Sequence, residues 1–330
     1  MTTRKRTALI AGGIALGLLI SGLAGCGPKQ EAAAPKKVAV LIDWVHEPTY
    51  LGVYYAVERG FFQKFGIVAD IVEVQGANRA ISAVANGQYL LSTASGGATA
   101  LAFNQYQNVR SLGVIYPKVA TTVYGIGTSI RRPQDLVGKR VGIYPGSINN
   151  SEFAAFLKKN QIDAKSVEVV AISGSDVALL VEGKIDAAVN YRELSPVQLA
   201  LELERRGDKR GVFSLPLANY AELGYGLNLV SSTEALTKEA STVDAAARAI
   251  FLGYNEACRD QEDATQMFGA RFKEFSAEYV RKSWSEVCNQ IRFPVGGQTA
   301  AEWAQTIAVF RELDLLKAPV DTGDVLPARR

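Results

Sequence analysis

Short apolar runs alternate with amphipathic stretches along the chain from residue 38 onward. The runs KVAVLID, VADIVEV, YLLSTA and VRSLGVIY have the length and β-branched content of strands, and helical patterns such as YLGVYYAVERGFFQKF separate them. A second set begins at Leu136, with strands KRVGIYP, SVEVVAI and IDAAVNY. After the strand GYGLNLVS, which starts at Gly224, the chain reads as helical to Leu316. This alternation predicts an α/β fold with mainly parallel sheets flanked by helices.

The two sets follow the same order and predict two similar lobes. Corresponding strand ends lie 49 residues apart in the first set (43 to 92) and 46 apart in the second (144 to 190). Two copies are too few for a solenoid. The chain is expected to cross between lobes in TTVYGIGTSIRRPQ and to return in NYAELGYGLNLVSS, because both segments are glycine-rich, as hinges often are. Lobe 1 is therefore assigned to residues 38–127 plus 225–330, with the C-terminal helices packed on it, and lobe 2 to residues 128–224.

The first 25 residues have the parts of a secretory signal: a positive segment at Arg4 to Arg6, an apolar segment at Ala8 to Ile20, and small residues leading to Cys26. The ending Leu-Ala-Gly-Cys resembles the bacterial lipobox. That resemblance implies cleavage before Cys26 and lipidation of this residue with diacylglyceryl and an acyl chain such as palmitate. The alternative is an ordinary signal with a chance cysteine. Residues 26–37 then read as a lipidated, flexible tether.

Charge and cysteine content exclude several classes of function. The chain has 36 basic and 33 acidic side chains, and removal of the signal leaves 33 of each sign, so a nucleic-acid partner is not expected. One histidine and scattered cysteines give no zinc-type spacing. We expect neither a metal nor a cofactor. Cys258 and Cys288 lie on two helix-like segments, where they form either a disulfide between neighbouring helices or two buried free thiols.

Polar and aromatic residues follow four of the predicted strands. Ligands of open α/β sheets bind at the carboxyl ends of strands, so two facing lobes would form a binding cleft. The candidate ligand-binding residues are Asp43, Trp44, Tyr50, Ser95, Gly96, Tyr144, Gly146, Ser147, Asn149, Asn190, Tyr191 and Glu193.

Each of these residues also has a structural interpretation. Trp44 could stack on a flat ring or lie in the core. Asp43 could accept hydrogen bonds from an amino group or cap the following helix. Glu193 could pair with the edge of an amino-bearing ring or open the next helix at the surface. The helix starts after Ser95 and Ser147 offer backbone donors to an anion or carbonyl, or are simply N-capped.

His46 and Glu47 suggest catalysis at first sight. A general base needs a nucleophile or an activated water, and neither a Ser-His-Asp order nor a metal pair can be read from the sequence. We interpret His46 as a pocket rim or loop residue, and we expect the protein not to be an enzyme. Tyr50 and Tyr54 share one helix face, and we expect one of them at the cleft and the other packed inside lobe 1.

A lipobox, two α/β lobes and two crossings together resemble the solute-binding protein of an ABC importer. The stretch VLIDWVHEPTYLGVYYAVERGFFQKFGI is similar to the opening motif of the thiamine-precursor-binding family, which is related to the yeast enzymes that make hydroxymethylpyrimidine phosphate. The matching residues are Asp43, Trp44, Gly52, Tyr54, Ala56, Gly60, Phe61, Phe62 and Gly66. The segment RRPQDLVGKRVGIYPGS resembles the start of lobe 2 in the wider family, which takes up sulfonates, taurine and nitrate.

The chain also departs from that motif. Tyr50 stands where the family usually has a histidine, and His46 lies in the loop instead. The cysteine-rich motif and the active-site histidine of the yeast enzymes are missing, which disfavours a pyrimidine-synthesising enzyme.

The resemblance implies a type II-like periplasmic-binding-protein fold. It also implies a lipid-anchored, extracytoplasmic monomer that closes on a thiamine pyrimidine precursor or a similar heteroaromatic ligand and delivers it to an ABC permease. An anion of the sulfonate, taurine or nitrate type is the alternative ligand, and a sensory role without a transporter is a further alternative.

Overall fold

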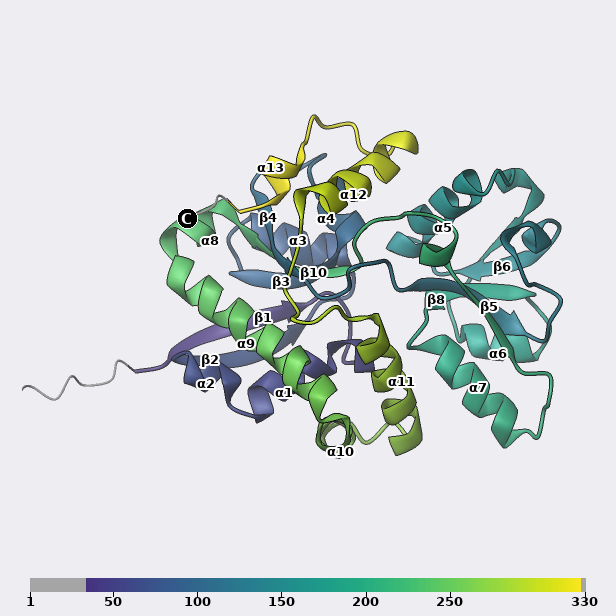
Figure 1. Ribbon diagram of the computed structural model, residues 1–330, viewed down its shortest axis with the longest axis horizontal. Coiled ribbons are helices and arrows are strands. Elements are labelled where there is room, and N and C mark those ends of the chain that lie inside the picture. Colours follow the sequence, from purple (N-terminus) through teal and green to yellow (C-terminus); the bar gives the residue numbers. More distant parts are fainter. Residues whose placement is uncertain (1–33, 328–330) are drawn as a thin grey trace, which may run out of the picture. The chain divides into compact units, whose positions relative to one another are not determined.

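A computed structural model describes residues 34–327, and the described residues from Pro35 on form one compact unit. Two five-stranded sheets organise this unit (Figure 1). The first sheet has the order β2 (Ile67–Glu73), β1 (Lys36–Ile42), β3 (Leu91–Ser95), β10 (Leu227–Ser232) and β4 (Val109–Val114). The second has the order β7 (Glu168–Ala171), β6 (Arg140–Ile143), β8 (Ala187–Tyr191), β5 (Thr121–Ile126) and β9 (Val212–Pro216). The predicted α/β fold with two lobes is confirmed.

The two sheets have the same topology. In lobe 1, β1 pairs in parallel with β2 and β3, and in lobe 2, β6 pairs in parallel with β7 and β8. Each sheet then receives one antiparallel strand, β10 in lobe 1 and β5 in lobe 2. Each of these strands enters its sheet directly after the chain has crossed from the other lobe. Every residue of β3 and β10 is buried, as expected for central strands covered on both faces.

The first crossing lies earlier than the sequence indicated. Residues 121–126, assigned to lobe 1 as part of the crossing, form β5, which is hydrogen-bonded on both sides within the second sheet. The chain therefore crosses at residues 115–120. The assignment was wrong because the glycine-rich pattern of this stretch is shared by hinges and strands, and only the pairing with β8 and β9 decides between them. The return crossing, residues 220–226, falls inside the predicted segment.

The helices of lobe 1 cover its sheet and extend to the C-terminal part of the chain. They are η1 (Pro48–Tyr50), α1 (Leu51–Glu58), α2 (Phe61–Lys64), α3 (Ala77–Ala85), α4 (Gly96–Ala102), α8 (Thr233–Lys238), α9 (Ala240–Arg259), α10 (Gln261–Arg271), α11 (Ala277–Gln290), α12 (Ala300–Glu312) and α13 (Thr322–Val325). Helix α9 packs against α1, with Gly253 directly against the backbone oxygen of Gly52, so a side chain at residue 253 would collide with α1.

The helices of lobe 2 are η2 (Pro133–Leu136), α5 (Ile148–Lys159), η3 (Ala164–Ser166), α6 (Asp176–Val181), α7 (Ser195–Arg205) and η4 (Leu217–Asn219). The teal half of Figure 1 shows α6 and α7 on one side of the second sheet and α5 on the other. Helix α12 packs on α4 of lobe 1 and also touches α5 of lobe 2. One apolar cluster accordingly joins Phe103 of lobe 1, Phe153 of lobe 2 and Trp303 of α12.

The two cysteines that the sequence left open are bonded. Cys258 near the end of α9 and Cys288 near the end of α11 form a disulfide with their Cα atoms 5.5 Å apart. Within residues 34–327, none of the helices combines the length and apolar character needed to cross a membrane. The predicted signal, Cys26 and most of the predicted tether lie outside the described residues; Lys36 and Lys37, assigned to the tether, begin β1.

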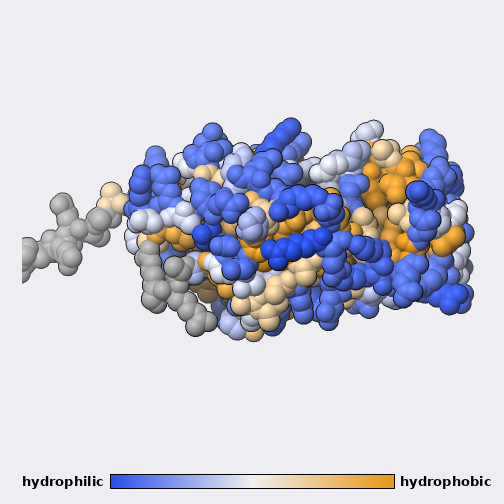
Figure 2. Space-filling model, turned by 90° about the horizontal axis from the view of Figure 1, so that it is seen from above, coloured by the Kyte–Doolittle hydropathy of each residue, from blue (hydrophilic) through white to orange (hydrophobic). Residues whose placement is uncertain are grey.

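The face seen in Figure 2 is mainly hydrophilic, with apolar side chains gathered over its lobe 2 half. Large apolar side chains exposed in lobe 2 include Val137, Val169 and Tyr220. None of them is among the predicted ligand-binding residues.

Candidate functional site

The loop after β1 carries the first candidate residues. Asp43 is buried, and its backbone N–H donates to the Thr93 hydroxyl oxygen on β3 at 2.9 Å. One carboxylate oxygen of Asp43 accepts from the hydroxyls of Thr93 at 2.5 Å and Tyr50 at 3.0 Å. Burial raises the pKa of Asp43, and these two hydrogen bonds oppose that shift. Asp43 thus fixes the loop to β3 and η1 through side-chain hydrogen bonds, and it does not cap a helix.

Trp44 has a different environment from its neighbour. Its side chain is 43% exposed, which makes it the most exposed large apolar residue in this loop, so the interpretation as a core tryptophan is wrong. No ring contact joins it to another aromatic side chain of residues 34–327. The indole is therefore partly exposed next to the buried Asp43, and the stacking role stays a prediction.

His46 links two parts of lobe 1. Its ring stacks on Phe272 at 4.4 Å, Nδ1 lies 2.7 Å from a Glu73 oxygen, and Nε2 lies 2.5 Å from a Glu274 oxygen. Partial burial lowers the pKa of His46, but the two carboxylates raise it, and the net shift is upward. A protonated imidazole donates from both nitrogens, so His46 ties the loop after β1 to the end of β2 and to the α10–α11 connection. This geometry suits a structural link rather than a general base.

Glu193, in the loop between β8 and α7, reaches from lobe 2 to lobe 1. Its side chain is completely buried. One carboxylate oxygen accepts from the hydroxyls of Thr49 and Tyr116, both at 3.1 Å, and the other accepts from the amide nitrogen of Gln290 at 3.1 Å. Burial raises the pKa of Glu193, and the three donors oppose the rise. The alternative interpretation, in which Glu193 opens the next helix at the surface, is therefore wrong.

Three more candidates from lobe 2 have side chains fixed by local hydrogen bonds, and a fourth, Tyr191, lies near several carboxyl groups. Asn190 donates to Asp176 at 2.9 Å and to the hydroxyl of Ser195 at 2.7 Å, which joins β8 to α6 and α7. Tyr144 donates to the carbonyl of Gly174 at 2.7 Å. Asn149 accepts from Thr121 at 3.4 Å. Tyr191 lies near Asp43, Glu152 and Glu193, whose charges add to burial in raising its pKa.

The helix starts have structural contacts where ligand contacts were predicted. The hydroxyl of Ser95 caps α4 by accepting from Ala98, and the N–H of Gly96 donates to the carbonyl of Gly226 at 2.5 Å. A side chain at residue 96 would collide with the Tyr225 backbone, so this glycine allows close packing against the return crossing. The donor of Gly96 is thus already used, which corrects the prediction of a free anion-binding helix start. The sequence pattern at Gly96 cannot distinguish anion binding from close packing, because glycine is suited to both.

The start of α5 is arranged differently. The Ser147 hydroxyl donates to the carbonyl of Tyr144 at 2.9 Å and does not cap the helix. Gly146 is exposed and has a φ of 73°, a left-handed conformation that glycine adopts without strain. The turn that carries Ser147 is therefore held by its own hydrogen bonds, and its role in ligand contact remains a prediction.

Carboxyl groups of both lobes act electrostatically on Glu47 or on Tyr191; these groups and Glu47, here called the acidic cluster, are Asp43, Glu47, Glu152, Asp176 and Glu193. Burial and the charges of Glu193, Asp176 and Asp43 raise the pKa of Glu47 to about 8. Burial raises the pKa of Glu152 to about 7, although Thr121 donates to this carboxylate. Within residues 34–327, no three His, Cys, Asp or Glu side chains are grouped as metal ligands. Burial and carboxyl groups of the cluster together raise the pKa of Tyr50, Tyr144 and Tyr191.

The sequence missed several residues of this site. Thr49, Tyr116 and Gln290 contact Glu193, and Glu152 and Asp176 belong to the acidic cluster. Tyr116 closely follows β4 and lies in the first crossing, so its position could have singled it out. Gln290 comes from a helix about 100 residues further along the chain, and no local signal connects it with Glu193.

A family comparison covers most of this region. The family described as "NMT1/THI5 like" matches residues 47–264, which is more than half of the chain. The chain belongs to the NMT1/THI5-like family. The matched span includes both crossings and all of lobe 2, so the family resemblance of the sequence extends well beyond the opening motif.

Relatives of this NMT1/THI5-like chain include a binding protein and a synthase. The formylaminopyrimidine-binding protein of Halalkalibacterium halodurans is 26% identical over 325 residues, covering 94% of this chain and 96% of that protein. The 4-amino-5-hydroxymethyl-2-methylpyrimidine phosphate synthase of Uromyces fabae is 25% identical over 165 residues, covering 49% of this chain and 48% of the synthase. The chain thus matches the binding protein over nearly its whole length and the synthase over about half.

Solved structures confirm the fold of this NMT1/THI5-like chain. The periplasmic aliphatic sulphonate-binding protein of Escherichia coli superposes with a TM-score of 0.71 at 16% identity, covering 88% of this chain and 97% of that one. The predicted two-lobed periplasmic-binding-protein fold is therefore confirmed, while this level of identity leaves the ligand open.

Proposed function

We propose that the protein is an extracytoplasmic solute-binding protein of an ABC importer, and that it captures an amino-bearing heteroaromatic ligand, a thiamine pyrimidine precursor or a similar compound, between its lobes. In this proposal it binds its ligand as a monomer without catalysing a reaction. The observation that carries the ligand class is the acidic cluster, carboxyl groups from both lobes that lie among tyrosine rings where the lobes meet. The name of the relative that matches over its whole length supports the same class.

The chemistry of the acidic cluster favours a ligand that donates hydrogen bonds. The groups that add to burial in raising the pKa of Glu47 are all acidic: Glu193, Asp176 and Asp43. A bound N–H donor would stabilise the ionised form of these carboxyls, whereas a sulfonate would add another negative charge among them. Trp44 supplies an exposed indole for stacking on the same ring. An amino-bearing aromatic ring satisfies both features.

Calorimetric titration with a formylaminopyrimidine and with an alkanesulfonate tests the ligand class. Ionised Glu47 accepts an N–H hydrogen bond more strongly than protonated Glu47, and its raised pKa leaves it largely protonated below about pH 8. Affinity for the pyrimidine should therefore rise between about pH 6 and about pH 8, by up to about tenfold per pH unit for each proton released. Glu47→Gln should flatten this dependence.

An anion-binding site would behave in the opposite way. Protonation of the acidic cluster would then favour the ligand, so affinity would fall as the pH rises. Binding of the alkanesulfonate with this pH dependence, and no binding of the pyrimidine by the folded protein, would overturn the proposed ligand class.

The membrane attachment rests on the lipobox that ends at Cys26. We expect Cys26→Ser to release the protein into the soluble fraction or to leave the signal uncleaved, because more than one acyl chain is needed for stable anchoring. Fractionation of membranes followed by detection of the protein measures this. Unchanged membrane retention with normal processing would contradict lipidation at Cys26.

A further inference from the structure

Helix α11 presents different residues to its two sides. Lys282, Glu286 and Gln290 follow one another at intervals of four and therefore share one face. That face meets lobe 2, since Glu286 pairs with Arg192 at 3.1 Å and Lys282 lies 3.5 Å from Glu204. Gln290 reaches Glu193 from the same face and also donates to the carbonyl of Glu286 at 3.0 Å. This face of α11 is the surface on which lobe 2 rests.

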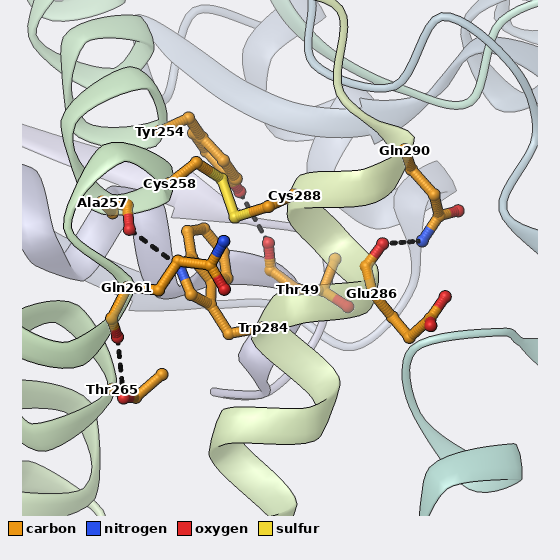
Figure 3. Close-up of a disulfide and its surroundings, with 10 residues drawn as sticks. All are labelled: Thr49, Tyr254, Ala257, Cys258, Gln261, Thr265, Trp284, Glu286, Cys288 and Gln290. Carbon is orange, nitrogen blue, oxygen red and sulfur yellow. Dashed lines mark hydrogen bonds between the residues drawn. A yellow bond between two sulfur atoms is a disulfide. The ribbon is translucent and has the colours of Figure 1, made fainter.

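The other side of α11 is joined to α9 by a hydrogen bond and by the disulfide. The indole nitrogen of Trp284 donates to the carbonyl of Ala257 at 3.0 Å, and Cys288, one turn further on, is bonded to Cys258. Figure 3 shows Glu286 and Gln290 on the side of α11 opposite the disulfide. The position of Gln290 therefore depends on how α11 is held against α9.

Helix α9 also supports Thr49, which is a second donor to Glu193. The hydroxyl of Tyr254, one turn before Cys258, donates to the carbonyl of Thr49 at 2.7 Å (Figure 3). The Thr49 hydroxyl in turn donates to one oxygen of Glu193, while Gln290 donates to the other. The two helices that the disulfide joins thus support two donors that meet at one carboxylate of the opposite lobe.

We infer that the disulfide between Cys258 and Cys288 positions Gln290 and Thr49 as the two sides of a clasp that closes on Glu193, so that this bond sets how firmly lobe 2 is held against lobe 1. The clasp is defined as Thr49, Gln290 and Glu193. The ligand-related consequence rests on the proposed function: a looser clasp lets a captured solute escape faster. The contact between the lobes itself needs no ligand.

Hydrogen exchange of the purified full chain, without ligand, tests this inference. Serine at both cysteines should speed amide exchange in residues 191–197, the lobe 2 segment that carries Glu193, by about tenfold, the loss expected for one hydrogen bond to a charged group. Gln290→Ala alone should produce a similar change. Combining Gln290→Ala with the two serines should add little, because both act on the same contact.

Ile81→Ala provides the matched control. Ile81 is buried on α3, which packs on lobe 1 strands and α4 and lies outside the clasp, so this variant loses stability without touching α11. It should leave exchange in residues 191–197 unchanged at temperatures well below unfolding. An equal effect of Ile81→Ala would show that general destabilisation, and not the clasp, controls this segment.

Three results overturn the inference: unchanged exchange in residues 191–197 after the disulfide is removed, no effect of Gln290→Ala in the wild-type background, or fully additive effects of the two changes. Because these measurements use no ligand, they are independent of the proposed ligand class. The dissociation rate of a bound formylaminopyrimidine, which should rise by the same factor of about ten, is read separately and tests the two proposals together.

Discussion

Replacing both cysteines of the disulfide by serine should lower the free energy of unfolding by about 3–4 kcal/mol. The bond closes a loop between residues separated by 30 positions. In the chain-entropy account, removing the bond increases the conformational entropy of the unfolded chain, which stabilises the unfolded state by this free energy. Urea denaturation followed by circular dichroism measures the change. The protein should stay folded at room temperature, since Trp284 still holds α11 through its hydrogen bond to Ala257.

Reduction of the wild-type protein with a thiol reductant provides the control for this prediction. It should reproduce the loss of stability seen with serine at both positions, and the serine variant should not respond to the reductant. A loss below about 1 kcal/mol would mean that the unfolded chain gains little freedom when the loop is opened, contrary to the chain-entropy account.

The second large effect is a loss of ligand affinity, expected when the side-chain type at residue 193 or residue 290 of the clasp is changed. Glu193→Gln places an amide donor where Gln290 already donates, and Gln290→Glu places a second carboxylate beside Glu193. Each change leaves a mismatched buried pair and should weaken ligand binding by about 1–3 kcal/mol, or about 5- to 150-fold. Calorimetric titration with a formylaminopyrimidine measures the affinity.

The double exchange, Glu193→Gln with Gln290→Glu, should recover most of the lost affinity. It restores one donor and one acceptor at a distance that is 3.1 Å in the wild type, and the hydroxyls of Thr49 and Tyr116 can still donate to the amide oxygen at residue 193. Losses that simply add in the double variant would show that Glu193 and Gln290 do not act as a pair. Unchanged affinity in Glu193→Gln alone would remove Glu193 from ligand capture altogether.

Much of the fold could be predicted from the pattern of apolar residues. Runs such as KVAVLID and IDAAVNY became β1 and β8, and the repeated order of strands and helices predicted two lobes of the same topology. The order is readable because apolar periodicity reflects which faces of each element are buried. The opening motif also singled out Asp43 and Tyr50, which lie buried after the end of β1 and in η1, and their contact with a ligand stays a prediction.

The site was predictable only in part. Tyr191 and Glu193 were singled out because Tyr191 ends β8 and Glu193 follows it, and ligands of α/β sheets bind at strand ends. Their partners could not be found in this way. Hydrogen bonds to Glu193 come from η1, from the crossing after β4 and from α11, and these segments are far apart in sequence.

The sequence by itself determined the class of fold, the two-lobed plan, and a concentration of acidic and aromatic residues at strand ends, because local periodicity and residue type carry that information. The tertiary structure decided that Thr121–Ile126 belongs to the second sheet, that Cys258 and Cys288 are bonded, and that Gly96 serves packing. It also decided that Glu193 is held by donors of the opposite lobe. Each of these depends on which distant segments meet, and a distance of a few ångströms between such segments is set by the packing of the whole unit.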